Sequence, residues 1–476
     1  MTICVAILAC LFTAARAESS SSSDDVDFII SHLVSPGARD QFPALTNPTP
    51  VRPHEVGYVD EDDLVLGVFI NGEARAYPES LGEWHEVIND ELGGQFITVS
   101  FCPLTGSGLN YSARDEFGEQ ITYGVSGSLI NSNLVIYDRR DDTLYPQITF
   151  TSLNGPTKGE QLEILPVVET TWDMWKRLHP ETTVPLAGSG LDRFSAAARL
   201  NYTEKAYVTE PYAEYRVDND DIPFPPPRGF DARLRPKEIV PIVCIGRESN
   251  AYALNSIPDG AVINDDIDDE YYTLIYDAAS RTTVSYRSEV DGEILFFYAV
   301  EPVGGLPIEF RDFETDSRWT MRGEAVEGPL KGRQLQQLAT FNTMWFAWAG
   351  FVNRPPLWRV GDGIFEPPVE TAIVASAAAA LPAAFSLGQN APNPFNAETQ
   401  IRYSLARAGQ VELSIHNLAG QPVRVLASGI QEAGVHAVNW DGLDETGQPS
   451  ASGVYVYRLQ SAPSGLLLTK RMVLLQ

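Results

Sequence analysis

Residues 65–78 read VLGVFINGEARAYP, and a related stretch, VPIVCIGRESNAYA, follows at 240–253. β-Branched runs such as Leu64–Ile70 and Gln95–Phe101 are bounded by Asn-Gly or Gly-Gly pairs, which suit strands and tight turns. The sequence therefore predicts paired strands at the start of two similar segments.

Three further matches preserve the same order along the chain. VIND at 87–90 recurs at 262–265, GPTKGEQL at 155–162 recurs as GPLKGRQL at 328–335, and the Trp172/Trp175 pair recurs as Trp345/Trp348. The offset stays between 173 and 175 residues throughout. Several matches at one offset predict an internal duplication. We place the first copy at 40–187, a Pro-rich connector at 188–237 and the second copy at 238–368.

Each copy is expected to be a β-rich α+β unit, and the two units to pack as a pair. Further strands are predicted, for example at Leu134–Tyr137 and Glu293–Tyr298, and a closing helix at Glu169–Leu178 and Thr340–Ala349. The tryptophans of each helix are three positions apart, so they share one face and are interpreted as core anchors. The GPxKGxQL segments are expected to form tight loops.

The pattern changes after an Ala-rich linker at 369–384. Short strands are expected at Gln400–Leu405, Gln410–His416, Pro422–Leu426, Val435–Trp440, Val454–Leu459 and Leu466–Leu475. Regular short strands separated by turn residues predict an Ig-like β-sandwich over 385–476.

Charge narrows the choice of partners. The chain of 476 residues carries 63 acidic and 34 basic residues, a formal net charge of −29. A field of that sign repels phosphate backbones, so nucleic acid is not an expected partner.

The first residues are typical of an export signal. An apolar run leads to Ala15-Arg16-Ala17, an A-x-A cleavage pattern, which predicts a signal peptide at 1–17 and a flexible leader at 18–39. The run is too short to span a bilayer, so no transmembrane segment is expected after cleavage. The n-region lacks Lys and Arg, and a lipoprotein signal ending at Cys10 is the alternative.

The predicted mature chain keeps two cysteines, Cys102 and Cys244. Two cysteines do not make a disulfide framework. A single bridge between them remains open in an oxidising compartment.

The copies differ at positions that suggest function. His85, Glu86 and Cys102 are present in the first copy, where the second has Gly260, Ala261 and Asp277. A thiolate with a histidine base nearby would make a nucleophile or a soft metal ligand. A buried structural cysteine is the competing interpretation. The segment HEVIN lacks the second histidine of a zinc-protease motif.

Other polar residues complete the candidate list. We treat Glu86, Asn89, Ser107 and Asp138 as possible ligand-binding residues, although Asn89 and Asp138 also suit turns. A metal ion at Cys102 and His85 is one hypothesis. The acidic loops Asp218–Asp221 and Asp265–Glu270 could bind calcium, but they lack the alternating ligand spacing of an EF-hand loop.

Several of these motifs together resemble a bacterial domain-of-unknown-function family (DUF3179-like). The resemblance rests on DQFPALTNP, LGVFINGEARAYP, HEVIND, FCPLTGSG, YGVSGSLINSNLVIYDRR and the closing tryptophan helix before His179-Pro180, and it extends to about Phe351. It implies no reaction. Tyr145 stands where the family often has Trp, and Asn353-Arg354 follows the second helix without a histidine.

The C-terminal segment is similar to two known modules. APNPFN, AGVHAVNWDG, SGVYVYRL and KRMVLLQ resemble the sorting domain of type IX secretion cargo and the Ig-like domain of the flagellar hook-capping protein. The first resemblance implies secretion or sorting machinery as a partner of residues 385–476. It also implies a secreted or outer-membrane surface location.

Two functions follow as hypotheses. The first is an exported binding or interaction protein that holds an unknown ligand between the copies. The alternative is a thiol- or metal-dependent enzyme that uses Cys102 and His85.

Overall fold

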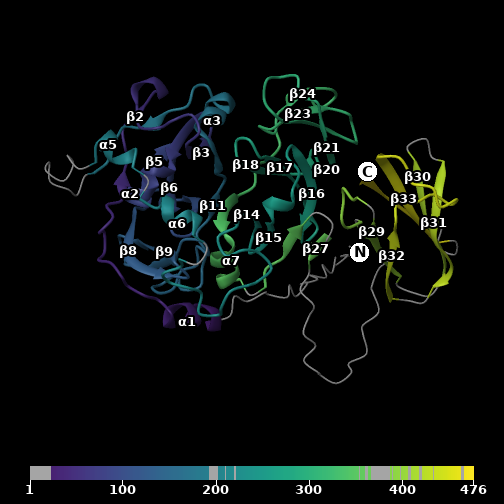
Figure 1. Cartoon of the computed structure of the whole chain (residues 1–476), viewed down its shortest axis with the longest axis horizontal. Coiled ribbons are helices and arrows are strands. Elements are labelled where there is room, and N and C mark those ends of the chain that lie inside the picture. The colour runs from purple at the N-terminus through teal and green to yellow at the C-terminus, as the bar shows by residue number, and fades with distance from the viewer. Residues whose placement is uncertain are drawn as a thin grey trace, which may run out of the picture.

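The computed structural model describes most of the chain (Figure 1). The described residues are 23–191, 202–209, 211–218, 221–352, 354–359, 363–365, 386–388, 390–396, 398–405, 409–417, 421–431, 434–461 and 466–475. The predicted signal peptide at 1–17 and the predicted linker at 369–384 lie outside them.

The first part of the chain is built mainly from short antiparallel sheets. It opens with α1 (Ser23–Ser31) and contains α2 (Glu79–His85) and α3 (Trp172–Leu178). Its strands are β1 (Leu45–Thr46), β2 (Pro50–Val51), β3 (Leu64–Ile70), β4 (Glu73–Pro78), β5 (Val87–Leu92), β6 (Gln95–Cys102), β7 (Ser107–Ser112), β8 (Tyr123–Ile130), β9 (Asn133–Asp138), β10 (Leu144–Pro146), β11 (Ile164–Leu165), β12 (Val168–Thr171) and β13 (Val184–Pro185).

The second part is also rich in strands and ends its main body with α7 (Trp345–Phe351). Its strands are β14 (Ile239–Ile245), β15 (Glu248–Tyr252), β16 (Ala261–Ile267), β17 (Glu270–Asp277), β18 (Thr282–Arg287), β19 (Glu289–Val290), β20 (Glu293–Ile294), β21 (Phe297–Val300), β22 (Glu309–Asp312), β23 (Arg318–Thr320), β24 (Ala325–Glu327), β25 (Thr340–Met344), β26 (Leu357–Arg359) and β27 (Gly363–Phe365).

Three sheets of the first half have a counterpart in strand order in the second half. The order β12-β3-β4 matches β25-β14-β15, β5-β6-β7 matches β16-β17-β18, and β10-β9-β8 matches β23-β22-β21. The predicted β-rich body is therefore confirmed. Equivalent strands begin 171 to 175 residues apart, as do Leu64 of β3 and Ile239 of β14.

Both closing helices are shorter than the sequence predicts. The prediction of a helix from Glu169 was wrong, because Val168–Thr171 forms β12 and pairs with β3, and the helix begins only at Trp172. The Thr171 side chain accepts a hydrogen bond from the Met174 backbone N–H and so caps the helix. The second helix likewise begins at Trp345 rather than Thr340.

The predicted strand at Glu293–Tyr298 is interrupted as well. Glu293–Ile294 ends one short hairpin as β20, and β21 starts only at Phe297. Between them the Phe296 backbone N–H donates to the Glu314 carboxylate instead of to a ladder.

The halves are joined by reciprocal backbone hydrogen bonds. The Thr171 N–H donates to the Ser280 carbonyl at 3.1 Å, and the Met344 N–H donates to the Thr105 carbonyl at 2.7 Å. The Asn342 amide also donates to the Glu169 carboxylate at 2.9 Å, between positions 173 residues apart. Each half thus contributes the same edge to the junction.

Each of the two large hydrophobic cores is shared between the halves. One core combines residues of β3, β4 and α3 with Val284, Phe310 and Trp319 of the second half. The other combines residues of β14, β25 and α7 with Val87, Leu109 and Ile136 of the first half. The four helix tryptophans are buried in these cores. Separating the halves would therefore expose both cores to water.

The segment between the halves is more than an extended connector. It contains α5 (Glu204–Tyr207) and α6 (Ala213–Val217), and Tyr207 and Tyr215 are buried. The Tyr215 hydroxyl donates to the Leu104 carbonyl at 2.7 Å, and Arg216 forms an ion pair with Glu83. The described connector residues therefore pack on the first half.

The C-terminal module is a two-sheet sandwich with its own core. One sheet has the order β28-β29-β32 (Ser386–Leu387, Thr399–Leu405, Gly434–Trp440), and the other has the order β31-β30-β33-β34 (Pro422–Gln431, Gly409–Asn417, Gly453–Ser461, Leu466–Leu474). Its core contains residues of this module alone, with Trp440 fully buried. The module lies beside the second half (Figure 1), where Lys470 donates to the Tyr271 hydroxyl at 3.0 Å.

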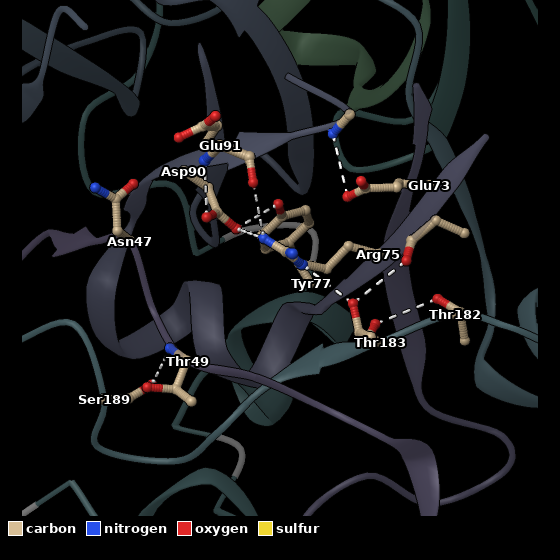
Figure 2. Close-up of polar contacts among 12 residues, drawn as sticks. Asn47, Thr49, Glu73, Arg75, Tyr77, Asp90, Glu91, Thr182, Thr183 and Ser189 are labelled. Carbon is tan, nitrogen blue, oxygen red and sulfur yellow. Dashed lines mark hydrogen bonds and ion pairs between the residues drawn. The ribbon is translucent and has the colours of Figure 1, made fainter. Parts of the chain in front are cut away.

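A buried ion pair links the first hairpin to β5 (Figure 2). Arg75 donates to the Asp90 carboxylate at 2.5 Å, and the Tyr77 hydroxyl donates to the same oxygen at 2.8 Å. Both charged side chains are almost fully buried. Burial raises the pKa of Asp90, while the Arg75 guanidinium acts to lower it.

The equivalent carboxylate of the second half has no cation beside it. Asp265 accepts hydrogen bonds from Tyr252, Tyr272 and the Asn250 amide. Burial raises the pKa of Asp265 to about 6, since neutral donors compensate the charge less completely than a guanidinium does.

We predict opposite tolerance at these two positions. Asp90→Asn should lower the free energy of unfolding by about 3–5 kcal/mol, because it leaves the Arg75 charge buried without a partner. Asp265→Asn should cost less than about 1.5 kcal/mol, since the tyrosine hydroxyls can accept from the new amide. Denaturant unfolding of both variants at pH 7 measures the difference, and equal losses would contradict it.

Candidate functional site

His85 is fully buried and both of its ring nitrogens have partners. Nδ1 lies 2.6 Å from the Pro43 carbonyl oxygen, and Nε2 lies 2.8 Å from the Tyr207 hydroxyl of α5. Burial lowers the pKa of His85 to about 4, so the imidazole is neutral at physiological pH. These contacts tie the connector to the end of α2 and leave neither nitrogen available to a metal ion or a nucleophile.

Cys102 ends β6 as a buried thiol. Its Sγ donates to the Ser132 carbonyl at 3.6 Å and accepts from the Leu134 backbone N–H at 3.4 Å. Burial raises the pKa of Cys102 to about 11, and the nearby Glu86 adds to the shift. The thiol is thus protonated at neutral pH, and its hydrogen-bond partners are not those of His85. This arrangement does not favour a cysteine–histidine nucleophile.

Glu86 follows α2 in a left-handed conformation with φ of 58°. Burial raises the pKa of its carboxyl to about 8, and Tyr212 of the connector is electrostatically coupled to it. Cys244, the other cysteine of the predicted mature chain, is also buried, and both thiols are free in the structure. The bridge that the sequence left open is therefore not formed.

Asn89 connects three segments of the first half. Its amide donates to the Leu45 and Tyr123 carbonyls, and its Oδ1 accepts from the Tyr123 backbone N–H and the Thr98 hydroxyl. Asn264 of the second half bonds both backbone groups of Phe297 in the same way. The Asn89 side chain is fully buried and has no hydrogen-bonding capacity left for a ligand.

Ser107 belongs to a fully buried polar network. Its hydroxyl donates to the Gln147 amide oxygen at 2.6 Å and lies 2.8 Å from the Thr105 hydroxyl. The Asn133 amide donates to both Thr105 and Gln147. With every group in reach of a partner, the network stabilises the turn after Cys102.

Asp138 closes a turn at the end of β9. Its carboxylate accepts from the Arg140 backbone N–H at 2.8 Å and forms an ion pair with the Arg140 guanidinium. These bonds use the side chain locally, as the turn interpretation predicts.

The acidic loops do not converge on a cation. Asp265 and Asp266 lie on β16, and Asp268 and Asp269 form the hairpin turn to β17 with positive φ. The loop 218–221 lies partly outside the described residues. Across the described ranges, no group of three or more His, Cys, Asp or Glu side chains is arranged to hold a metal ion.

The structure instead contains an open cleft of about 870 Å³ between the halves. One wall comes from β3, the start of β4 and the segment after α3, and the other from β18 and the loops around β24. The lining residues are Gly67, Phe69, Ile70, Asn71, Gly72, Ala74, Gln95, Leu165, Pro166, Val168, Trp175, Leu178, His179, Pro180, Glu181, Thr282, Val284, Tyr286, Met321, Arg322, Glu324, Gln334, Leu335, Gln336 and Gln337.

A stack of three rings forms the first wall. The His179 ring lies 4.3 Å from the Trp175 ring and 4.7 Å from the Phe69 ring, at interplanar angles of 42° and 27°. Trp175 packs directly on Gly67, where a Cβ atom would come within 2.2 Å of the indole. Phe69 remains 51% exposed.

His179 is the chemically distinctive group of the cleft. Burial, together with the Arg322 charge, lowers the pKa of His179 to about 4, so the ring is neutral at physiological pH. Among the described residues, neither ring nitrogen makes a hydrogen bond. A neutral imidazole in this position offers one donor and one acceptor to a bound molecule.

The positions equivalent to this wall are filled in the other half. Cys244 stands at the position of Phe69 and Val352 at that of His179. Cys244 is buried, and Val352 packs against the same apolar cluster as Trp348. The open cleft is therefore not a simple result of the repeated strand order.

The sequence contained a partial signal for this site. His179 was noted as part of a motif, but its stacking partner Phe69 lies 110 residues earlier and Arg322 lies in the other half. An isolated exposed phenylalanine on a strand carries no signal of its own.

A family model described as "Protein of unknown function (DUF3179)" matches residues 39–355. The chain belongs to this family. The match covers both halves and the cleft between them. A second model, the FlgD Ig-like domain, matches residues 394–465 and so confirms the Ig-like prediction for the C-terminal module. No curated protein matches the chain.

Likeness to solved structures is weak. FlgD from P. aeruginosa is 20% identical over 16% of this chain and 64% of its own, with a TM-score of 0.14. Dimeric latent PorU from Porphyromonas gingivalis is 11% identical over 87% of this chain and 34% of its own, with a TM-score of 0.18. PorZ from the same organism is 11% identical over 87% and 56%, with a TM-score of 0.15. This chain thus spans less than two thirds of each.

A search of the described helices for a membrane span gave none that is long and apolar enough.

We predict that His85 makes folding sensitive to acid. An unfolded imidazole takes up a proton near pH 6.5 and the buried one only near pH 4, so the unfolded state gains as pH falls between these values. The full shift corresponds to about 3 kcal/mol. His85→Gln should lower stability at pH 7, and its deficit relative to wild type should shrink as the pH approaches 4.

Denaturant unfolding at several pH values measures this effect. His54→Gln, which replaces an exposed histidine, serves as the matched control. A deficit of His85→Gln that stays constant from pH 7 to pH 4 would refute the prediction.

Proposed function

We propose that this protein is an exported binding protein that holds its ligand in the cleft between its two halves. The observation that carries the proposal is the wall formed by Phe69, His179 and Trp175. An exposed aromatic face and an imidazole with free hydrogen-bonding capacity line a cleft of about 870 Å³. Sites for small molecules are usually concave and apolar with a few polar groups, and their volumes are of this order.

The predicted thiol or metal chemistry has less support. Cys102 is a buried thiol with a raised pKa, and His85 bonds to Pro43 and Tyr207. Neither group lines the cleft. A binding role at the cleft therefore accounts for more of the geometry than catalysis by this pair.

We infer that the two halves arose by duplication of one unit. The constant sequence offset and the common strand order support this origin. A duplicated unit produces two equivalent junctions, one of which can keep the structure while the other changes. The different residues at the Phe69 and Cys244 positions are what such divergence would produce.

We also propose that residues 385–476 direct the protein to the cell surface through the type IX secretion machinery. The signal-like first residues and the tail motifs KRMVLLQ and SGVYVYRL support this role. The module has a core of its own, so it is separable from the binding body.

Deleting residues 385–476 should leave a folded body that is not displayed at the surface. The body keeps both shared cores, so its thermal unfolding should be close to that of the full chain. Fractionation and surface proteolysis in a cell with type IX machinery measure display. Normal display of the truncated chain would overturn the sorting role.

Small aromatic probes should bind the cleft through Phe69. Saturation-transfer NMR of the full chain with phenol and benzamide should give signals that Phe69→Ala removes, because the exposed ring is lost. Phe117→Ala is the matched control, since Phe117 is 81% exposed and lies outside the cleft lining. Signals that are absent in wild type, or equal in wild type and Phe69→Ala, would contradict binding at this cleft.

A further inference from the structure

The charges that line the cleft are already compensated. Arg322 forms an ion pair with Glu324 at 3.0 Å, and Glu181 forms one with Arg52 at 3.1 Å. The lining contains no other acidic or basic side chain apart from the neutral His179. A charged ligand would have to displace one of these pairs, so the cleft favours a neutral ligand.

Amide side chains provide most of the remaining polar groups. Five of them line the cleft: Asn71, Gln95, Gln334, Gln336 and Gln337. Gln334 donates to the Arg322 carbonyl at 2.7 Å, which fixes its amide and leaves the oxygen as an acceptor. Within the described residues, the side chains of Gln95 and Gln336 make no hydrogen bond. Each amide has both a donor and an acceptor and is therefore matched to hydroxyl groups.

The strand edges beside the cleft are mostly covered. The 336–338 segment pairs with β18, where the Arg287 N–H donates to the Gln336 carbonyl and the Leu338 N–H to the Ser285 carbonyl. Thr183 covers the edge of β4 through backbone bonds to Ala74 and Ala76. The short β11 ends at Pro166, which has no N–H. An extended peptide would thus find few backbone groups with which to pair.

The exposed face of Phe69 completes the pattern. Its ring is held by the stack on His179, so it offers a fixed apolar surface rather than a mobile one. The C–H face of a pyranose ring packs on such a surface while its hydroxyl groups point sideways towards hydrogen-bonding partners. Here the surrounding partners are the amides and the His179 ring.

We propose that the ligand of this cleft is a neutral oligosaccharide, with one sugar ring on Phe69 and its hydroxyl groups bonded to Gln336, Gln95 and His179. This inference rests on the proposed binding function. It adds the chemical class of the ligand.

The test is a glycan microarray probed with the full mature chain. Calorimetry with the best neutral hit and with hexagalacturonate and hexa-alanine follows. At least one neutral glycan should bind, and Phe69→Ala should weaken it about tenfold, which corresponds to about 1.4 kcal/mol. Gln336→Ala should weaken it several-fold, and Phe117→Ala should leave it unchanged. Hexagalacturonate and hexa-alanine should bind at least tenfold more weakly than the neutral hit.

The outcomes separate the two proposals. If phenol and benzamide bind through Phe69 but no neutral glycan on the array binds, the cleft is a binding site and the saccharide inference falls. Preference for the acidic oligomer or the peptide also overturns it, as does a neutral glycan whose affinity Phe69→Ala leaves unchanged. If neither probe nor glycan binds, both proposals fail.

Discussion

The structure depends on a reciprocal contact between its halves. Thr171 of the first half bonds the Ser280 carbonyl, and Met344 of the second bonds the Thr105 carbonyl. Glu169 and Asn342 meet at the same junction. These bonds place β12 beside β18 and β25 beside β7. The apolar faces of both halves then close on each other to form the two shared cores. Neither half keeps a complete core by itself, so folding and the assembly of the cleft are one process.

Local structure followed from local sequence to a useful extent. β3 has the predicted bounds Leu64–Ile70, and the Ig-like strands lie within a few residues of their predicted positions. These segments alternate strongly and end at Gly or Asn turns. The helix starts were wrong, because Glu169–Thr171 and Thr340–Met344 fit a helical period yet pair as β12 and β25. Their conformation is decided by the junction between the halves, which is a tertiary effect.

The candidate site could be predicted only in part. Presence in one copy and absence from the other selected His85, Glu86 and Cys102, and all three are buried beneath the connector. The partner that occupies His85 is Tyr207, 122 residues away, and nothing in the sequence near either residue indicates this pairing. Unequal residues between copies therefore mark where the environments differ. At His85 the difference is a packing contact with α5, and at Phe69 it is an open surface.

The energetics of the two equivalent positions favour a role for the open one. Full burial of a phenylalanine side chain stabilises a fold by about 1.5–3 kcal/mol. Phe69 is 51% exposed and gains only part of that, whereas Cys244 at the equivalent position is buried in a closed core. The fold can clearly close this surface, since it does so in the other half. Keeping Phe69 exposed beside an unbonded imidazole and several amides leaves apolar and polar groups unsatisfied together, and a ligand that covers both would satisfy them at once.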